Sequence, residues 1–548
     1  MEPIFTDKQL NNMSREDLIS LMKIVQEQTK KKDTEIQLLK DKQKELEFLN
    51  AMLSDRLTLA QRKQFGASSE KYAEGYEQMN LFNEAEANAD AETEELFEEI
   101  RPSSYKRKKR KGKKEEDLSN FETVETRTYK LEGEARYCPE CGKKYNVVTK
   151  ETVKRLRFVP AKFAVEEEIT YVYSCPECGS MKRPEKEPSL IRGSIATPSL
   201  VAGIMNAKYV NGMPLARQER EFARYDLDLS TKTMANWIIN CADRYLKPLY
   251  QLMKEELLES RYIHCDESRI QVLGEPDQKG TTQNWMWVYL TDEFSGSPQM
   301  VLFDYERTRA GYHPVNFLGD RFHGYLTCDG YQAYHSLGEG IIVSGCLTHA
   351  RRRFDAALTA LKKDFTKEQL KETIAYQAMS RIGILYKIEE MIHNKTPEEK
   401  YEERQKQSRP VMDALFEWLH TMEDSVDRSS LIGDAILYTL NQEAYLKRYL
   451  EDGHLSIDNN SAERALKNFA VGRRNWLFAK SVRGAGASAL VYSITETTLL
   501  NHLKPYAYLT YILDELRKMG AFPKEEELKK LLPWSEDLPE YCRTKLKK

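Results

Sequence analysis

Apolar residues recur at helical spacing near the start of the chain, over residues 14–62. This segment holds no glycine or proline, and its leucines are spread among many Lys, Glu and Gln residues. The spacing predicts a long helix whose heptad repeat is interrupted at Gln28 and Lys32. We expect a short or imperfect coiled coil, and the alternative is a solvated helix packed on its own domain.

Helical patterns return after residue 197. Three stretches carry them, over residues 197–212, 214–227 and 230–250. Thr197 and Ser230 stand where N-caps belong, and Asn211-Gly212 predicts a turn between the first two helices. Three short helices with tight turns resemble a helix-turn-helix, although such trihelical units also occur as plain packing modules.

Strand-like runs dominate the next part of the chain. Five short apolar or alternating runs are separated by turn residues, at 262–273, 284–292, 298–305, 323–331 and 340–346. One helix-sized stretch, 308–318, precedes the fourth run. The pattern predicts a mixed α/β sheet opened by three consecutive strands. From Leu347 to about Leu450 the chain is helical and highly charged, which we interpret as a helical insertion.

Charge changes abruptly between the N-terminal helix and these segments. Residues 84–99 hold eight carboxylates and no basic residue, whereas residues 106–114 hold eight basic residues in nine. Blocks of like charge repel themselves, so residues 73–125 are expected to form a flexible linker. The basic block could neutralise DNA phosphates, or it could serve only as a solubilising segment. The net charge of −3 is an average over such oppositely charged segments. It therefore neither supports nor excludes a nucleic-acid partner.

The bulk composition excludes several classes of protein. A chain of 548 residues is expected to hold several domains, and 41% hydrophobic with 31% charged residues describes a soluble protein. No run approaches the roughly 18 apolar residues of a membrane span, and the first residues do not read as a secretory signal. We therefore expect a cytoplasmic protein without a membrane role. Nine cysteines, an odd number, favour metal ligation over disulfides where they cluster.

Four of these cysteines do cluster, as two CxxC pairs. They are Cys138, Cys141, Cys175 and Cys178. Four thiolates suit a tetrahedral, structural Zn²⁺ ion, and the gap of 33 residues between the pairs favours a ribbon-like module. The β-branched and aromatic residues of 163–174 predict a hairpin between the pairs. A chance pairing or a redox dithiol is the alternative.

Two aspartates belong to the predicted sheet. Asp266 lies in the first strand run and Asp329 at the end of the fourth, so pairing of these strands would bring both carboxylates to one edge. Carboxylates held together favour a hard divalent ion such as Mg²⁺, which suggests metal-assisted phosphodiester chemistry. The spacing of two aspartates is weak support by itself.

Three stretches of the chain resemble the transposases of the insertion sequence 66 family. They are QRKQFGASSEKY (61–72), GCLTHARRRFDAAL (345–358) and HLSIDNNSAERALKNFAVGRRNWLFAKSVRG (454–484). The order of the predicted parts is also similar, and the resemblance covers most of the chain. It implies a ribonuclease H-like core with an Asp, Asp, Glu triad, interrupted by the helical insertion.

Carried over by position, the resemblance implies that Asp266, Asp329 and Glu463 are the catalytic, magnesium-binding residues. Two Mg²⁺ ions, for which Mn²⁺ may substitute, would support cleavage of the element's DNA ends and transfer of the 3′ ends to target DNA. The implied partners are DNA, further copies of the chain assembled on DNA, and small accessory proteins encoded by the same element. The expected location is the bacterial cytoplasm, in association with the nucleoid.

The role of Glu463 has a structural alternative. Asn460 followed three residues later by Glu463 fits a capping box at the start of a helix over 461–470. Asp458 is then the fallback metal ligand. Glu267 should point to the opposite face of its strand from Asp266, so we exclude it from the metal site.

Basic residues flank two of the family stretches. Those expected to hold DNA phosphates are His349, Arg351, Arg352, Arg353, Arg464, Lys467, Arg473 and Arg474. A solvated face is the alternative for any single one of them, because exposed basic residues are common.

These predictions describe a multidomain α+β protein. Its expected parts are a coiled-coil segment (1–72), a charged flexible linker (73–125), a zinc-binding module (126–190), a helix-turn-helix-like DNA-binding segment (191–255), the catalytic core in two parts (256–356 and 451–500), a helical insertion (357–450) and a C-terminal helical segment (501–548). The alternatives are a non-catalytic zinc and helix-turn-helix DNA-binding protein and a coiled-coil assembly protein. Neither gives the three acids a function.

Overall fold

The computed structural model describes residues 140, 143, 163–174, 181–182, 184–338, 340–362, 364–520 and 522–545. The predicted coiled-coil helix, the charged linker and the four cysteines of the zinc module lie outside these residues. The chain divides into two compact units, and the larger one contains residues 188–223 and 227–542.

The smaller unit contains a short two-stranded ladder. Strand β1 (Tyr173–Ser174) pairs antiparallel with β2 (Met181–Lys182). The hairpin predicted over 163–174 is therefore wrong for residues 163–172, which form no strand. Their side chains are exposed, and β-branched residues favour a strand only where they pack against a partner.

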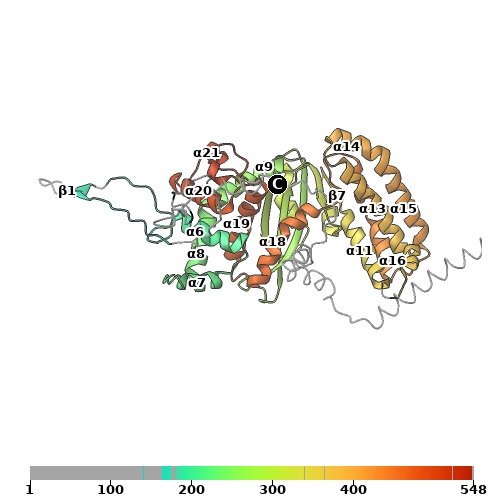
Figure 1. Ribbon diagram of the computed structural model, residues 1–548, viewed down its shortest axis with the longest axis horizontal. Coiled ribbons are helices and arrows are strands. Elements are labelled where there is room, and N and C mark those ends of the chain that lie inside the picture. Colours follow the sequence, from blue (N-terminus) through green and yellow to red (C-terminus); the bar gives the residue numbers. More distant parts are fainter. Residues whose placement is uncertain are drawn as a thin grey trace, which may run out of the picture. The chain divides into compact units, whose positions relative to one another are not determined.

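A five-stranded mixed sheet forms the centre of the larger unit (Figure 1). Its strands are β3 (Tyr262–Gln271), β4 (Gln283–Thr291), β5 (Met300–Glu306), β6 (Gly324–Cys328) and β7 (Ile341–Gly345), in the order β5-β4-β3-β6-β7. β4 is antiparallel to β3 and β5, whereas β6 is parallel to β3 and β7. The predicted mixed sheet opened by three consecutive strands is confirmed.

Helices cover both faces of this sheet. Phe303 of β5 contacts Phe469 of α18 (Asn460–Trp476) and Tyr492 of α19 (Val482–Leu500), with ring centroids 6.1 and 5.5 Å apart. On the other face, Tyr289 of β4 stacks on Phe317 of α10 (Tyr312–Leu318) at 3.7 Å, and Lys254 of α9 (Lys247–Glu259) lies over the same Phe317 ring. The sheet is thus the middle of three layers.

The predicted helices before the sheet are present. They are α6 (Pro198–Met205), α7 (Leu215–Ala223) and α8 (Thr231–Cys241), with π-helical turns at Asn206–Val210 and Ala242–Leu246. The Thr197 and Ser230 hydroxyls accept the expected N-cap hydrogen bonds, and Gly212 takes the positive φ of the predicted turn. The third helical run continues through the second π turn into α9 and ends at Glu259, beyond residue 250, because its buried apolar positions continue.

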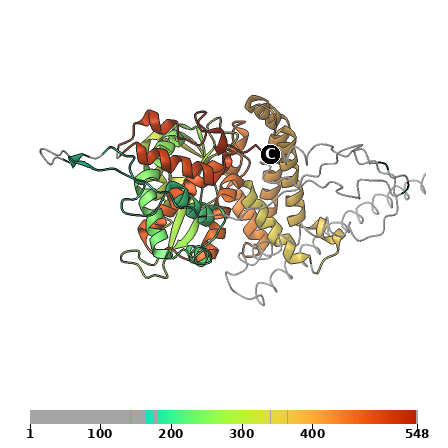
Figure 2. The same ribbon diagram turned by 60° about the vertical axis from the view of Figure 1, so that its left-hand side comes forward.

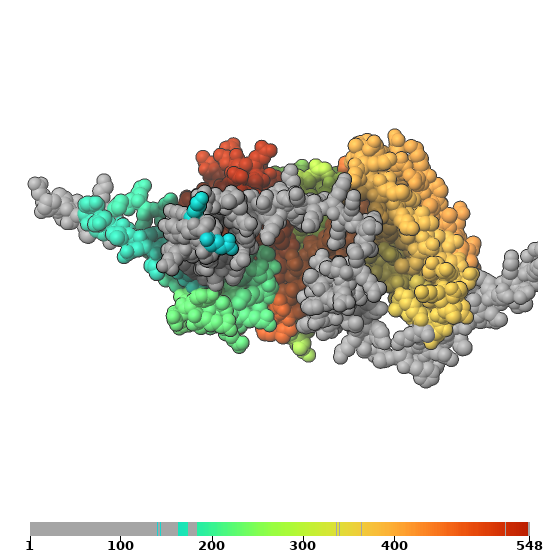
Figure 3. All heavy atoms as spheres, viewed as in Figure 1, coloured from blue at the N-terminus to red at the C-terminus, as the bar shows by residue number. Residues whose placement is uncertain are grey.

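The insertion between the sheet and α18 is a helical bundle (Figures 1 and 2). Its helices are α11 (Leu347–Leu361), α12 (Lys367–Glu372), α13 (Ile374–Ile392), α14 (Pro397–Glu403), α15 (Arg409–Glu423), α16 (Leu431–Asn441) and α17 (Glu443–Leu446). Leu385, Phe416 and Ile436 belong to a hydrophobic cluster distinct from the one around the sheet. In Figure 3 the atoms of this bundle, yellow to orange, form a lobe of their own.

The two ends of the insertion lie side by side. The Leu347 N–H donates to the Ile457 carbonyl oxygen at 3.1 Å. Arg404, which is buried, pairs with Glu389 at 2.7 Å and donates to the Leu455 carbonyl at 2.9 Å. The insertion therefore returns the chain to the sheet at a fixed point, from which α18 begins. Helices α20 (Pro505–Lys518) and α21 (Glu525–Lys529) follow α19.

Candidate active site

Two of the predicted acids are brought together by the pairing of β3 with β6. The two strands are parallel, with His264 opposite Thr327. Asp266 lies two residues beyond His264 and Asp329 two residues beyond Thr327, so the two aspartates lie at the same level of neighbouring strands. The structure contains the pairing of the first and fourth strands on which this placement depends.

The third acid, Glu463, reaches the same region from α18. Asp266 lies opposite Val288, and Val288 lies opposite Phe303, whose ring packs on α18 and α19. Burial raises the pKa of Asp266 well above its usual range, and the negative charges of Glu267, Asp329 and Glu463 raise it further. The negative charges of Asp329 and Glu463 are therefore close enough to Asp266 to disfavour its ionised form.

Glu267 faces away from α18, as expected for the next residue of a strand. Its carboxylate accepts hydrogen bonds from Tyr334 and Arg309. The Arg309 guanidinium also lies 3.7 Å from the Asp329 carboxylate and stacks over the Tyr331 ring. Arg309 thus links Glu267 to the second predicted acid from the far side of the sheet.

Glu463 has a basic partner on the insertion. Arg352 of α11 forms a bidentate ion pair with it, and one of the two hydrogen bonds measures 3.0 Å. The His349 ring nitrogen Nε2 lies 4.0 Å from the same carboxylate. Two of the residues expected to hold DNA phosphates therefore lie directly beside the third predicted acid.

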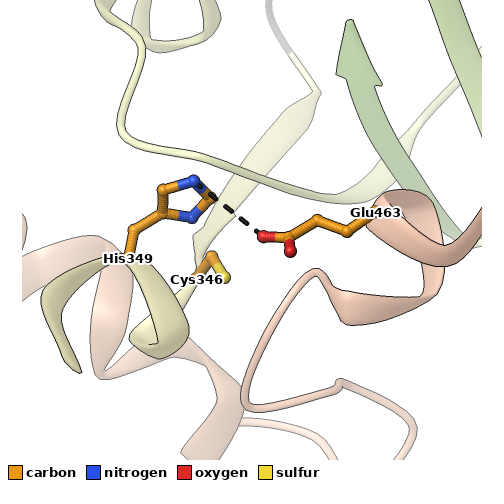
Figure 4. A group of neighbouring side chains, drawn as sticks. All are labelled: Cys346, His349 and Glu463. Carbon is orange, nitrogen blue, oxygen red and sulfur yellow. Dashed lines mark ion pairs between the residues drawn. The ribbon is translucent and has the colours of Figure 1, made fainter. Parts of the chain in front are cut away.

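Cys346, His349 and Glu463 form a compact cluster (Figure 4). One potential ligand atom from each lies within 4.8 Å of the others. Among the described residues, these three side chains are the group whose potential ligand atoms lie this close together. The carboxylates of Asp266, Asp329 and Glu463 do not form such a group. Sequence reasoning missed Cys346, although its spacing from His349, one helical turn, was a usable signal.

Burial sets the protonation of this cluster. It raises the pKa of the Cys346 thiol to about 12 and lowers the pKa of His349. At neutral pH the pair is therefore a thiol and a neutral imidazole. The His349 Nδ1 atom is buried and has no hydrogen-bond partner within the described part of the chain.

Asn459 connects the segments that carry the site. It is fully buried, and its side-chain amide donates to the Cys265 carbonyl at 2.9 Å while its oxygen lies 2.9 Å from His264 Nδ1. Its backbone N–H donates to the Cys346 sulfur at 3.2 Å. One residue thus joins the strand of Asp266, the start of α11 and the start of α18. Sequence reasoning placed Asn459 in a family stretch but gave it no role.

A buried ion pair continues this connection. His264 Nε2 lies 3.1 Å from Asp292, which follows β4. Burial disfavours the charged imidazole, but the charge and hydrogen bond of Asp292, together with Asn459 and Asp458, outweigh burial and raise the pKa of His264. The raised pKa favours an imidazolium that donates to both Asp292 and Asn459.

The capping-box alternative for Glu463 is wrong. Helix α18 begins at Asn460 with Asn459 as its N-cap, and the Asn459 side chain makes no capping hydrogen bond. The Asn460 amide instead donates to Asp458 at 2.7 Å. Asp458, the fallback ligand, also accepts from the Asn460 N–H at 3.1 Å and from the Thr348 hydroxyl at 3.2 Å, so its carboxylate organises the start of the helix.

The remaining predicted DNA-binding residues differ in their surroundings. Arg464, Lys467 and Arg474 are exposed on α18. Arg473 instead packs on β3 and donates to the Ser268 hydroxyl at 3.3 Å. On α11, Arg351 lies over the Tyr386 ring, and Arg353 pairs with Asp434 and lies over the Tyr438 ring. Arg464, Lys467 and Arg474 therefore form an exposed basic face on α18.

Three segments of the chain match known protein families. Residues 193–487 match the transposase IS66 family. Residues 135–179, which contain all four clustered cysteines, match the zinc-finger binding domain of transposase IS66. Residues 52–120 match a domain described as transposase C of IS166 homeodomain. The last two matches support structural zinc and DNA as the partner.

Related proteins of similar length occur in Sinorhizobium fredii (strain NBRC 101917 / NGR234). The uncharacterized protein y4hP is 30% identical over 412 residues, which cover 72% of this chain and 73% of that protein. The uncharacterized protein y4jD is 29% identical over 418 residues, covering 74% and 79%. In the described residues, no helix is both long and apolar enough to span a membrane.

Proposed function

The chain belongs to the IS66 transposase family, and from this premise we propose that it cleaves the ends of its DNA element and transfers the 3′ ends to target DNA. The predicted family resemblance is confirmed. The observation that carries the proposal is the electrostatic interaction of Asp266 with Asp329 and Glu463, three acids supplied by β3, the end of β6 and the first turn of α18.

The donor set of the three acids fits Mg²⁺. Carboxylate oxygens are the ligands that Mg²⁺ takes, and the mutual repulsion that raises the pKa of Asp266 is what a divalent cation would relieve. When bound, two such ions, with Mn²⁺ as a substitute, would activate the attacking oxygen and stabilise the leaving oxygen.

The protein's own residues would hold these acids in place. Asn459 fixes the start of α18 against β3, and Arg352 and Arg309 neutralise charge beside Glu463 and Asp329. Because Arg352 is on α11, the helix that leads from the sheet into the insertion, DNA phosphates near Glu463 would meet a guanidinium from a different part of the protein. We assign Arg352 to positioning of Glu463.

The remaining parts follow the same proposal. The sheet with its two central parallel strands supports a ribonuclease H-like core, in parts 256–356 and 451–500, around the insertion 357–450. Residues 191–255 would read DNA as a helix-turn-helix. The coiled-coil segment 1–72 would join copies of the chain into an oligomer on DNA, where accessory proteins of the element could also act. Its place in the cell would be the bacterial cytoplasm, at the nucleoid.

Glu463→Gln and Asp458→Asn test the choice of the third acid. We expect Glu463→Gln to reduce Mg²⁺-dependent strand cleavage and joining by about 10³-fold, because a carboxylate metal ligand is lost. Asp458→Asn should cost much less, since its oxygens serve the helix start. The measurement is cleavage and joining of labelled DNA that carries the element's own ends, with and without Mg²⁺.

Asp355→Asn, an exposed acid of α11, is the matched control and should cut as the wild type does. Loss of activity in Asp458→Asn with full activity in Glu463→Gln would reverse the assignment. Full activity in both would exclude both residues as the third ligand. A wild type that binds element ends but cleaves nothing, even with accessory proteins added, would favour the non-catalytic DNA-binding alternative.

The basic face of α18 gives a separate prediction. Changing Arg464, Lys467 and Arg474 together to Ala should weaken DNA binding for all sequences alike, and it should reduce the slope of log affinity against log salt by about 3. Binding measured at several salt concentrations checks this. The control changes the exposed residues Lys524, Lys529 and Lys530 to Ala; an equal effect of both triples would show that α18 has no special part in phosphate contact.

A further inference from the structure

We propose that Cys346, His349 and Glu463 form a binding site for a zinc-class divalent ion, and that such an ion inhibits the protein by engaging Glu463. Binding at this site does not depend on the proposed function. The inhibition does rest on it, because it requires Glu463 to be a ligand of the catalytic Mg²⁺ ions.

The geometry of the cluster suits a zinc-class ion. Cys346 is the N-cap of α11, His349 is in its first turn, and Glu463 is in the first turn of α18. Figure 4 shows the three side chains converging on one point. Zn²⁺ takes such ligands at about 2.0–2.3 Å, which places ligand atoms about 3.5 Å from one another around a tetrahedral ion. The present separations, up to 4.8 Å, require only small side-chain movements.

The chemistry of the donor set separates this site from a magnesium site. A thiolate and an imidazole are ligands of zinc-class ions, whereas Mg²⁺ takes oxygen ligands. His349 adds an independent observation, because its buried Nδ1 atom has no partner in the described residues. A buried polar atom without a partner is unfavourable, and a metal ion bound at Nδ1 would supply that partner.

The surroundings already support the three ligands. The Asn459 N–H donates to the Cys346 sulfur at 3.2 Å, an interaction that stabilises a thiolate. Arg352 holds the Glu463 carboxylate by two hydrogen bonds, and a carboxylate retains lone pairs for a metal ion while it accepts them. Three protein ligands would leave a fourth position for water.

Sharing of Glu463 leads to competition between two kinds of ion. A Glu463 carboxylate that binds an ion together with Cys346 and His349 cannot at the same time bind an ion held by Asp266 and Asp329. Sites with sulfur and nitrogen donors bind Zn²⁺ far more tightly than Mg²⁺, so a small amount of Zn²⁺ should outcompete a large excess of Mg²⁺.

Binding is tested with Co²⁺ as a spectroscopic substitute for Zn²⁺ in the full chain. Wild type should bind one more Co²⁺ than Cys346→Ser, with a stronger thiolate-to-cobalt absorption band, while the four cysteines of the zinc module are the same in both. His349→Gln should also lose the extra ion. Cys241→Ser, which changes another buried free cysteine, is the control and should match the wild type. Equal stoichiometry and spectra in wild type, Cys346→Ser and His349→Gln would overturn the site.

Inhibition is tested by adding Zn²⁺ to the Mg²⁺-dependent cleavage reaction. The Zn²⁺ concentration for half inhibition should rise by about tenfold or more in Cys346→Ser relative to wild type. Equal inhibition of both would overturn the competition for Glu463. If neither protein cleaves DNA even with accessory proteins added, the proposed function fails, whereas the Co²⁺ experiment still decides whether the metal site exists.

Discussion

Asp266→Asn is expected to reduce Mg²⁺-dependent cleavage by at least about 10³-fold and, at neutral pH without added Mg²⁺, to stabilise the folded protein. Activity falls because a metal ligand is lost. Stability rises because burial and three neighbouring carboxylates disfavour the Asp266 charge in the folded state, and the neutral amide avoids that cost. Cleavage assays and urea unfolding check the two effects.

The pH dependence follows from the raised pKa of Asp266. The favourable contribution of the protonated form is complete below the unfolded pKa, near 3.8, and is lost as the pH rises through the folded pKa. The stability difference between Asp266→Asn and wild type should therefore vanish in acid and grow toward neutral pH. Added Mg²⁺ should stabilise wild type alone. A variant that is less stable than wild type at pH 7 would contradict this account of the charge cluster.

Asn459→Ala should lower the free energy of unfolding by about 3 kcal/mol. The substitution leaves the His264 Nδ1 atom and the Cys265 carbonyl oxygen buried without their hydrogen-bond partner. Cleavage should fall as well, since the variant loosens the contact between the strand of Asp266 and the helix of Glu463. Urea unfolding and the cleavage assay are the measurements.

Asn460→Ala is the matched control for this variant. Asn460 is only partly buried and its side chain donates to Asp458, so its loss should cost about 1 kcal/mol or less. Equal destabilisation by both substitutions would show that the buried connection through Asn459 is not special.

The sheet and two of its acids could be predicted from the sequence because their signals are local. Each strand is a short apolar run bounded by turn residues, and Asp266 and Asp329 stand at fixed places in two such runs. Parallel pairing of these strands then brings the two aspartates to the same level of the sheet, just past the last residue of β6. The N-caps Thr197 and Ser230 were predictable for the same reason, since a cap is set by the residues next to it.

Long-range connections were not predictable in this way. Asn459 and Cys265 are hydrogen-bonded although they are 194 positions apart, and no periodic pattern indicates such a contact. Glu463 was identified by family resemblance alone. The capping-box alternative failed because a local pattern did not reveal that Asn460 binds Asp458. The hairpin over 163–172 failed because strand propensity cannot supply a pairing partner.

The hydrogen bond between Leu347 and Ile457 holds the two ends of the insertion together, whatever the length of the chain between them. The bundle between these residues starts and ends at the same point and has its own apolar cluster. Each doubling of a flexible loop costs only about 0.6 kcal/mol of closure entropy. Residues added to or removed from the bundle's outer turns would therefore leave the start of α18 in place against β3, so the insertion can grow or shrink without displacing Glu463.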